Sequence, residues 1–190
     1  MRLFVGLLPP RQALDELARA LEPHRAAWPE LRWLNAVNWH VTLSFLGEVP
    51  EAALPGLHVR LARAASRHEP MTLSFAGGGA FPSARRARVF WTGLRGPELR
   101  LVRLADSLGA GARRAGAEQT DRRRLRPHLS LARARSGVDV QDLVDAFAAF
   151  AGSSWEADTV HLVRSHLGAT VRYEKVGDYP LAAPASDGRD

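Results

Sequence analysis

The chain contains no cysteine among its 190 residues. This absence excludes a disulfide framework, a thiolate metal site and a cysteine nucleophile, and it fits a reducing compartment. Long hydrophobic runs are missing as well, since the apolar run at residues 3–8 ends in two prolines and no stretch reaches the length of a membrane span. We therefore expect a cytoplasmic protein with no membrane association.

Lysine is nearly absent too. Lys175 is the single lysine among 26 basic residues, so arginine carries the formal net charge of +6. A genome rich in guanine and cytosine accounts for much of this bias, and exposed arginines also keep a surface soluble. Their distribution is more informative, because nine arginines fall within residues 103–135. The guanidinium fork suits phosphate groups, so this segment predicts contact with a polyanion, above all through Arg122, Arg123, Arg124 and Arg126.

Two tetrads in the chain match each other: His-Val-Thr-Leu at residues 40–43 and His-Leu-Ser-Leu at residues 128–131. Side chains alternate between the two faces of a strand, so each tetrad predicts a strand with a histidine and a hydroxyl on one face. We expect these polar faces to hold His40, Thr42, Ser44, His128 and Ser130. The opposite, apolar faces are expected to hold Val41, Leu43, Phe45, Leu129 and Leu131.

A single histidine on a strand is more often a half-buried structural residue than a catalytic one, but a matched pair can supply both an acid and a base. Near neutral pH one histidine can take a proton from a nucleophile while another gives a proton to a leaving oxygen. The sequence therefore predicts phosphodiester cleavage at a site made by His40 and His128. Thr42 and Ser130 would donate hydrogen bonds to phosphate oxygens. The residues alone leave open which histidine is the acid.

In their settings, residues 38–49 and 126–133, the tetrads resemble the two-histidine phosphoesterase superfamily. Within it they are most similar to the RNA 2′,3′-cyclic phosphodiesterases, long called 2′-5′ RNA ligases. The similarity extends to the opening strand at residues 2–7 and to residues 160–173. One departure is visible, because Ser130 stands where threonine is usual. The hydroxyl is kept, and the methyl group that stiffens the rotamer is lost.

The resemblance implies hydrolysis of RNA 2′,3′-cyclic phosphate ends to 2′-phosphomonoesters, with His40 as the proton donor and His128 as the proton acceptor. It implies no cofactor, no metal and RNA partners such as tRNA-like molecules or fragments, with reverse joining of RNA ends through 2′-5′ linkages. We expect a monomer. Further substrate contacts are expected from charged or stacking residues near the site, with core packing as the alternative for each aromatic ring: Arg126, Arg133, Trp39, Phe45, Trp91 and Tyr173.

The apolar spacing predicts an α+β order of elements. Strands are expected at residues 2–8, 39–47, 71–76, 88–94, 158–165 and 170–176, with the three glycines at 77–79 as a connection. Helical stripes are expected at 14–21, at 57–65 with Pro55 in the first turn, at 101–112 after Pro97, and at 143–148 after an N-cap at Asp139. The resemblance implies two pseudo-symmetric lobes of antiparallel sheet with helices outside and a central groove. They would form one domain, residues 1–181, before a disordered tail at 182–190.

Two other functions remain open at this point. The first is an enzyme of the same superfamily that acts on a small cyclic phosphate or a 2′-5′ oligonucleotide, although the arginine-rich segment argues against a very small substrate. The second is a non-catalytic RNA- or nucleotide-binding module, against which the intact His40 and His128 argue. A metal hydrolase has less support, since the sequence has no cysteine and no His-Asp cluster at ligand spacing.

Overall fold

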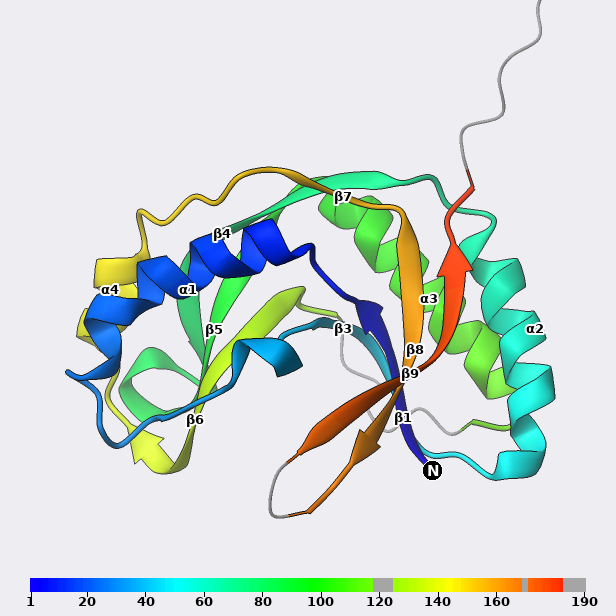
Figure 1. Cartoon of the computed structure of the whole chain (residues 1–190), viewed down its shortest axis with the longest axis horizontal. Helices are drawn as coiled ribbons and strands as arrows, with labels where there is room; N and C mark the ends of the chain where they lie inside the picture. The colour runs from blue at the N-terminus through cyan, green and yellow to red at the C-terminus, as the bar shows by residue number, and fades with distance from the viewer. Residues whose placement is uncertain (118–124, 169–170, 183–190) are drawn as a thin grey trace, which may run out of the picture.

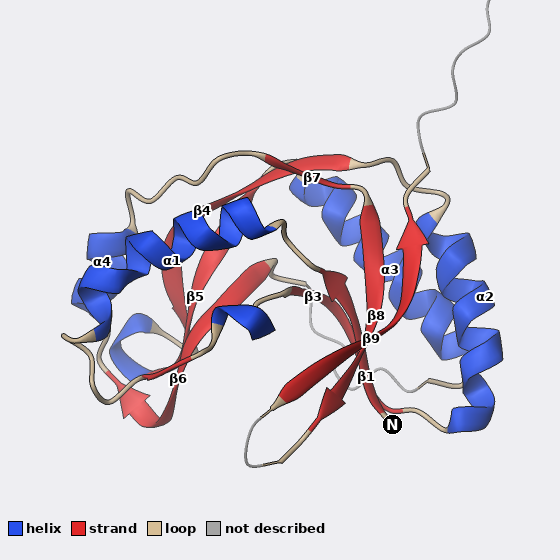
Figure 2. Ribbon diagram, in the orientation of Figure 1, coloured by secondary structure: helices blue, strands red, loops and turns tan. Residues whose placement is uncertain are grey.

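The computed structural model of the chain describes residues 1–117, 125–168 and 171–182. Within these ranges strands and helices are mixed along the chain (Figure 1, Figure 2). The strands are β1 (Arg2–Leu7), β2 (Arg32–Trp33), β3 (Val41–Glu48), β4 (Met71–Phe81), β5 (Ala87–Arg95), β6 (His128–Val138), β7 (Trp155–Ala157), β8 (Thr159–His166) and β9 (Arg172–Pro180). The helices are α1 (Arg11–Arg25), α2 (Leu54–Ala65), α3 (Glu98–Arg114) and α4 (Gln141–Phe147), with short 3-10 turns η1 (Ala36–Asn38), η2 (Glu51–Ala53) and η3 (Ala84–Arg86).

The described strands form one curled antiparallel sheet in the order β7-β4-β5-β6-β3-β1-β8-β9, with β2 paired to β6. Its two halves meet where β3 pairs with β6, and the register there consists of Val41 opposite Leu129. Figure 1 shows α1 and α4 beside one half of the sheet and α2 and α3 outside the other. The predicted α+β fold, with two lobes of antiparallel sheet and helices outside, is confirmed.

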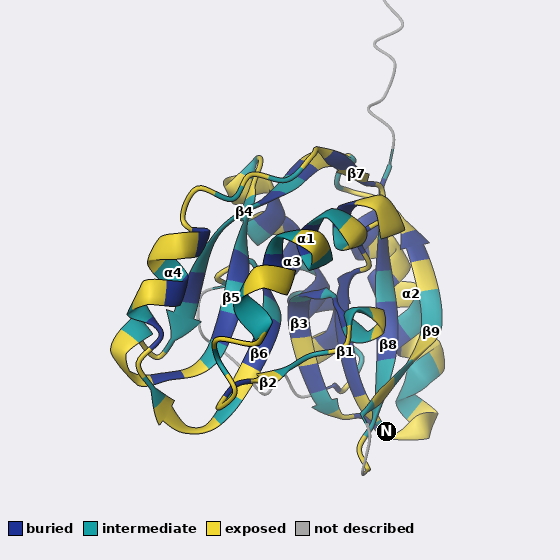
Figure 3. Cartoon of the chain, turned by 60° about the vertical axis from the view of Figure 1, so that its left-hand side comes forward, coloured by how far each residue is buried: buried dark blue, intermediate teal, exposed yellow. Residues whose placement is uncertain are grey.

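The helices α2 and α3 form because their apolar residues recur every three to four positions and can all reach the sheet. Leu57 and Leu61 of α2 and Leu104 and Leu108 of α3 are fully buried, as the predicted stripes require. Pro55 lies in the first turn of α2, where its missing N–H costs no helical hydrogen bond. Figure 3 shows the same division, with buried strands inside and exposed positions on the outer sides of the helices.

The other half of the sheet packs against α1 and α4. Phe75, Phe90 and Phe147 are its largest fully buried side chains. The predicted N-cap at Asp139 is wrong by one residue, because Val140 is the N-cap of α4 and makes no side-chain capping bond. An Asp139 carboxylate oxygen still accepts from the Gln141 N–H at 3.0 Å, one residue before the cap. Large buried rings of this kind contribute several kcal/mol each, roughly 3–5 when one is truncated to alanine. This core keeps β5 and β6 in place beneath the site.

The predicted glycine connection at residues 77–79 is wrong, because these glycines lie inside β4. Between Ala76 and Gly78 the register with β5 shifts, and the extra residue, Gly77, adopts a positive φ of 61°. Gly79 serves packing, since a Cβ there would come within 2.3 Å of the Trp91 ring. Glycine in a strand often marks a bulge or a close approach rather than a turn. The connection itself lies at residues 82–86 and contains η3.

Part of the predicted tail, residues 183–190, lies outside the described residues. Among the residues that are described, no helix combines the length and the apolar character needed to cross a membrane.

Candidate active site

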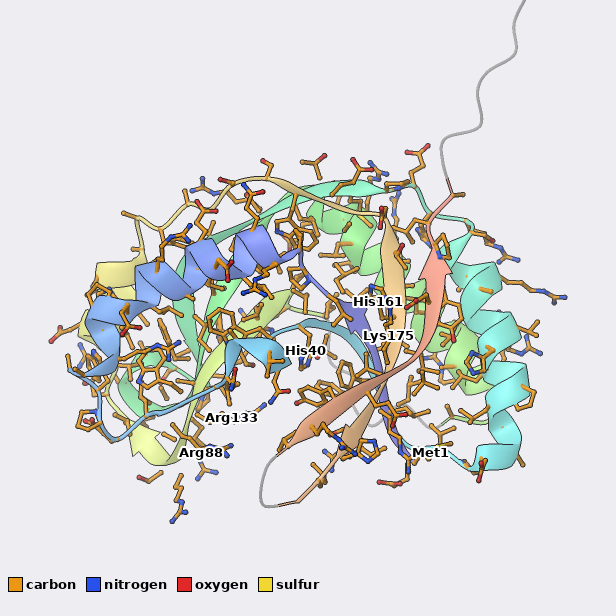
Figure 4. The ribbon with its side chains drawn as sticks, viewed as in Figure 1. Met1, His40, Arg88, Arg133, His161 and Lys175 are labelled. Carbon is orange, nitrogen blue, oxygen red and sulfur yellow. The ribbon has the colours of Figure 1, made fainter. Side chains whose placement is uncertain are left out.

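Both tetrads lie at the junction of the two sheet halves. His40 immediately precedes β3 and His128 begins β6, and the residue after each histidine, Val41 or Leu129, is the other's register partner. One step along an antiparallel register brings His40 towards Ser130 and His128 towards Thr42, on one face of the sheet. These four residues line a single pocket of about 670 Å³, and Figure 4 shows His40 in the concave middle of the molecule.

A bulge follows the hydroxyl residue in each tetrad. In β3, Thr42 pairs with Gly6 and Ser44 with Val5, so Leu43 has no register partner. In β6, Ser130 pairs with Trp91 and Ala132 with Phe90, so Leu131 is the extra residue. An extra residue shifts the alternation of all later side chains to the other face. β3 and β6 therefore share a bulge at the same position of the tetrad, as well as a similar sequence.

The bulge in β3 overturns two expected orientations. Ser44 was expected beside His40, but it is buried, with 3% of its surface exposed, and it does not line the pocket. Phe45 was expected on the apolar face, but its side chain is 45% exposed and lines the pocket. In β6 the corresponding bulge turns Arg133 into the pocket, whereas strict alternation would place it on the face of Leu129.

The backbone orients both imidazole rings in the same way. The Nδ1 of His40 lies 2.7 Å from the Asn38 carbonyl oxygen, and the Nδ1 of His128 lies 2.6 Å from the Arg126 carbonyl oxygen. A carbonyl oxygen only accepts, so each Nδ1 carries the hydrogen. The neutral ring then has an unprotonated Nε2, the form of a general base, and a protonated ring has an acidic proton at the same nitrogen. Each histidine can therefore exchange a proton through Nε2.

Aromatic rings pack against both histidines. Phe4 stacks on His40 with ring centroids 4.5 Å apart, and Tyr173 contacts the same imidazole edge to face at 4.9 Å. On the other side Phe81 meets His128 edge to face at 4.9 Å. Trp91 also lies near His128, with its centroid 6.0 Å away. This packing restricts the side-chain rotamers, so the rings are held for reaction rather than free to rotate.

The environment lowers the pKa of both histidines below the ordinary value of 6.5. Burial is the main cause in each case, because it disfavours the charged imidazolium, and the hydrogen bond to the backbone carbonyl opposes it. The positive charge of Arg133 lowers the pKa of both rings further, and His128 also lowers that of His40. The charge of Arg133 therefore acts on both histidines, which lie in one electrostatic environment. Near neutral pH both rings are mostly uncharged.

The pocket extends on both sides of the histidines. One side is lined by Trp33, Asn35 and Val89, and the other by Phe45, Val171 and Tyr173. Its volume falls within the range of about 300–1,000 Å³ typical of ligand sites. Cationic and aromatic residues together are the combination that proteins use to hold single-stranded nucleic acid.

Of the predicted binding residues, Arg133, Phe45 and Tyr173 line this pocket. Arg126 is exposed outside the pocket lining, with its guanidinium carbon 6.0 Å from the Phe81 ring centroid. Trp39 is 3% exposed and belongs to the core instead. Trp91 also stays outside the lining and packs beneath His128. The remaining three predicted residues, Arg122, Arg123 and Arg124, lie outside the described residues.

Sequence reasoning missed two of the four rings that pack against the histidines, Phe4 and Phe81. Phe4 lies on β1 and Phe81 at the end of β4, so neither is near a tetrad along the chain. Trp33 of β2 was also missed. It lies eight residues before Val41 along the chain and pairs with Ala132 of β6. The glycines at residues 78 and 79 gave no signal for these rings, because the rings that approach them are Phe147, Phe90 and Trp91.

Histidine, aspartate and glutamate side chains do not gather in the described part of the chain into any group of three or more that could hold a metal ion. Two further histidines pair with single carboxylates on the β8–β9 hairpin. His161 lies 2.7 Å from Asp178, and His166 lies 2.7 Å from Glu174. Neither of these histidines lines the pocket.

Comparison with known proteins identifies relatives over nearly the whole chain. A family model described as LigT like Phosphoesterase matches residues 7–91. An Archaeoglobus fulgidus protein named RNA 2′,3′-cyclic phosphodiesterase is 30% identical over 171 residues, 88% of this chain and 92% of that protein. A Geobacillus stearothermophilus protein of the same name is 27% identical over 98% of this chain, which spans 59% of that protein's length.

The fold agrees with these sequence relatives. The crystal structure of Escherichia coli LigT in its apo form superposes with a TM-score of 0.76 at 26% identity, over 95% of this chain and 97% of that one. The matched family region contains the first tetrad, and the Archaeoglobus relative is similar over most of both chains. This chain belongs to the LigT-like phosphoesterase family of the two-histidine superfamily, the group that contains the RNA 2′,3′-cyclic phosphodiesterases.

Proposed function

We propose that this protein hydrolyses RNA 2′,3′-cyclic phosphate ends to 2′-phosphomonoesters, with His40 and His128 as its acid and base. One observation carries the proposal: each histidine commits Nδ1 to a backbone carbonyl and lines the same pocket, so each keeps Nε2 for the substrate. The names of the curated relatives give the substrate class. The two matched tetrads support the part of the proposal that concerns the mechanism, acid and base catalysis by two histidines.

The proposed reaction is an in-line displacement at phosphorus. A water molecule loses a proton to Nε2 of His128 and attacks the cyclic phosphate, while the bond from phosphorus to the 3′ oxygen breaks. Nε2 of a protonated His40 gives its proton to that departing oxygen, which leaves a 3′-hydroxyl and a 2′-phosphate. Each proton transfer contributes about 10²- to 10⁴-fold to the rate. The family resemblance assigns these two roles, and an exchange of them would leave the product the same.

Hydroxyl and guanidinium groups around the histidines complete the proposed site. Thr42 and Ser130 lie one residue beyond the paired Val41 and Leu129, so their hydroxyls can donate to the non-bridging phosphate oxygens as charge develops there. Arg133 adds a positive charge in the pocket, and no described carboxylate lies within 4.0 Å of it. A cyclic phosphate would supply the missing counter-charge.

Aromatic residues on both sides of the histidines favour a nucleotide over a smaller cyclic phosphate. Phe45 and Tyr173 line one side of the pocket, and Trp33 lines the other. Every base offers a face on which such rings can stack. Arg122, Arg123, Arg124 and Arg126 would add a sequence-independent attraction for the rest of an RNA chain.

Joining of RNA ends would use the same groups. If the 5′-hydroxyl of a second RNA replaces water as the nucleophile, the same displacement joins the two ends through a 2′-5′ linkage. His128 then takes the proton of that hydroxyl and His40 again protonates the 3′ oxygen. We propose this joining as a minor activity, because water is present at far higher concentration than RNA ends.

Product analysis on a short RNA that ends in a 2′,3′-cyclic phosphate tests the proposal. We expect a 2′-phosphate end, with equal rates in the presence and absence of excess EDTA. Parallel reactions with 2′,3′-cyclic AMP and with a 2′-5′-linked dinucleotide test the narrower substrates, and the His40→Ala/His128→Ala variant controls for contaminating nuclease. A 3′-phosphate product would contradict the proposed departure of the 3′ oxygen. Turnover that EDTA removes and a divalent ion restores would contradict the two-histidine mechanism. Binding without any turnover would favour the non-catalytic module.

A further inference from the structure

A second hollow lies far from the histidines, along the seam between α2 and α3. It encloses about 220 Å³, and four arginines line it: Arg60, Arg63, Arg67 and Arg114. Figure 1 shows these two helices side by side outside the half-sheet of β1, β3, β8 and β9, while Figure 4 places His40 on the concave side. We call this hollow, with its eight lining residues, the helix groove. The other four are Ala64, Ser107, Ala110 and Gly111.

Small residues create the space in the helix groove. Gly111 of α3 lies so close to α2 that a Cβ there would come within 3.2 Å of the Arg60 carbonyl oxygen. Ala64 and Ala110 add only methyl groups to the floor. The helices can therefore approach closely, and the long arginine side chains form the rim above a shallow floor.

The charge of the helix groove is uncompensated within the described residues. Other arginines have carboxylate partners, such as Arg11 with Asp15 at 3.5 Å and Arg100 with Glu69 at 3.1 Å. By contrast, no described carboxylate lies within 4.0 Å of any of the four groove arginines, and the lining contains no acidic residue. Arginines placed only for solubility would not need to converge on one hollow with no acid among them.

Polar groups at one end of the helix groove point to an anionic ligand. Ser107 lines the groove, and its hydroxyl oxygen lies 2.9 Å from Nε2 of His68. With the hydrogen of His68 on Nε2, the ring donates to Ser107 and the hydroxyl hydrogen stays free for a phosphate oxygen. Burial lowers the pKa of His68, and the charges of Arg100 and Arg67 lower it further, so this end of the groove is positive even with His68 neutral. A hydroxyl beside several guanidinium groups is a typical donor set for phosphate oxygens.

We propose that the helix groove is a second phosphate-binding site, separate from the histidine pocket. Its volume is below the roughly 300 Å³ at which sites for whole drug-sized ligands begin, so it suits single phosphate groups rather than a buried nucleotide. Two sources can supply such groups, the backbone of an RNA chain and a free oligophosphate. The proposal does not depend on the chemistry of His40 and His128.

Melting of the protein in the presence of inorganic tripolyphosphate tests the site directly. The groove variant is Arg60→Gln/Arg63→Gln, and the matched control is Arg11→Gln/Arg19→Gln on α1, which removes the same two charges outside both pockets. We expect the groove variant to weaken the apparent tripolyphosphate affinity by about tenfold or more, the loss that follows when a charged hydrogen bond is removed. The control should stay within about twofold of the natural protein, since long-range surface charge is screened.

A third variant, Ala110→Glu, keeps every arginine but places a carboxylate in the helix groove. Glutamate suits a helix, so the fold should survive, and tripolyphosphate stabilisation should fall as in the groove variant. Equal losses in the groove variant and in the α1 control, or an unchanged response in both the groove variant and Ala110→Glu, would overturn the proposal.

RNA binding then separates the two phosphate sources. With a single-stranded RNA that ends in a 3′-hydroxyl, the groove variant should flatten the dependence of log affinity on log salt by about 1.4, since each phosphate contact contributes about 0.7. That result assigns the site to the RNA backbone, whereas a loss confined to tripolyphosphate assigns it to a free oligophosphate. Hydrolysis of 2′,3′-cyclic AMP should be unchanged in the groove variant. If the natural protein hydrolyses neither 2′,3′-cyclic AMP nor a short RNA that ends in a 2′,3′-cyclic phosphate, the proposed function fails while the phosphate measurements still stand.

Discussion

Val41 and Leu129 face each other across the junction of β3 and β6, and each directly follows a histidine of the pocket. Both side chains are fully buried behind the site. An approximate two-fold relationship therefore passes through this pair and exchanges His40 with His128 and Thr42 with Ser130. Because one register pair sets both halves of the pocket, small changes in either strand should affect the two histidines together.

The first prediction concerns the two histidines. His40→Ala and His128→Ala should each lower kcat by at least about 10²-fold, because both act in one transition state. The double variant should be little worse than either single variant, since groups that act as a unit are not additive. Steady-state rates on an RNA cyclic-phosphate end measure this, and a single variant with near-normal kcat would remove that histidine from the mechanism.

The second prediction concerns pH. Burial and the charge of Arg133 lower the pKa of both histidines, so the bell-shaped profile of kcat/KM should have its maximum on the acid side of about 6.5. The base keeps an unprotonated Nε2 down to a lower pH, which moves the acid limb of the profile to lower pH. The acid loses its proton at a lower pH, which moves the alkaline limb in the same direction. Arg133→Gln removes a positive charge and should raise both pKa values, which shifts both limbs towards alkaline pH. If Arg133→Gln lowers the maximum of kcat/KM but leaves both limbs at the same pH, the charge of Arg133 does not control the pKa values of the histidines.

The third prediction concerns the hydroxyls beside the histidines. Ser130→Thr should be nearly neutral, because the hydroxyl remains and β-branching suits a strand. Ser130→Ala should lower kcat by about 10- to 10³-fold, the effect of deleting a donor to transition-state charge, and Thr42→Ala should behave alike. If Ser130→Ala keeps full activity while Thr42→Ala does not, the two tetrads are not equivalent.

The fourth prediction distinguishes the roles of two aromatic residues that flank the first tetrad, Trp39 and Phe45. Phe45→Ala should raise KM about 5- to 150-fold on a cyclic-phosphate RNA with little loss of stability, because its ring lines the pocket and a stacked base is worth about 1–3 kcal/mol. Trp39→Ala should instead lower the free energy of unfolding by about 3–5 kcal/mol, because Trp39 is buried. Urea denaturation and steady-state kinetics on both variants test the difference, and the reverse pattern would contradict the assignment of Phe45 to the pocket.

The fifth prediction concerns the glycine beneath Trp91. A methyl group from Gly79→Ala would overlap the Trp91 ring, so we expect a destabilisation of about 1–3 kcal/mol and a lower kcat as the ring moves against His128. Gly56→Ala is the control, because nothing lies within 4 Å of a Cβ at that helical position. It should raise stability by about 0.5–1 kcal/mol and leave kcat unchanged. A Gly79→Ala variant as stable as the natural protein would show that the tryptophan has room to move.

The sequence alone determined the tetrads, their strands and the shared face of each histidine with its hydroxyl. Alternation along a strand is a local property of the backbone, so His40 with Thr42 and His128 with Ser130 could be paired without knowledge of the fold. The helical stripes were predictable for the same reason, since burial of α2 and α3 follows from their own periodicity.

Only the tertiary structure decided what surrounds those residues. The bulges at Leu43 and Leu131 arise from pairing with β1 and β5, and they alone turn Phe45 and Arg133 into the pocket. Phe4 reaches His40 from another strand, and the helix groove joins α2 and α3 from separate parts of the chain. Register and packing depend on partners distant in sequence, so no local pattern of residues specifies them.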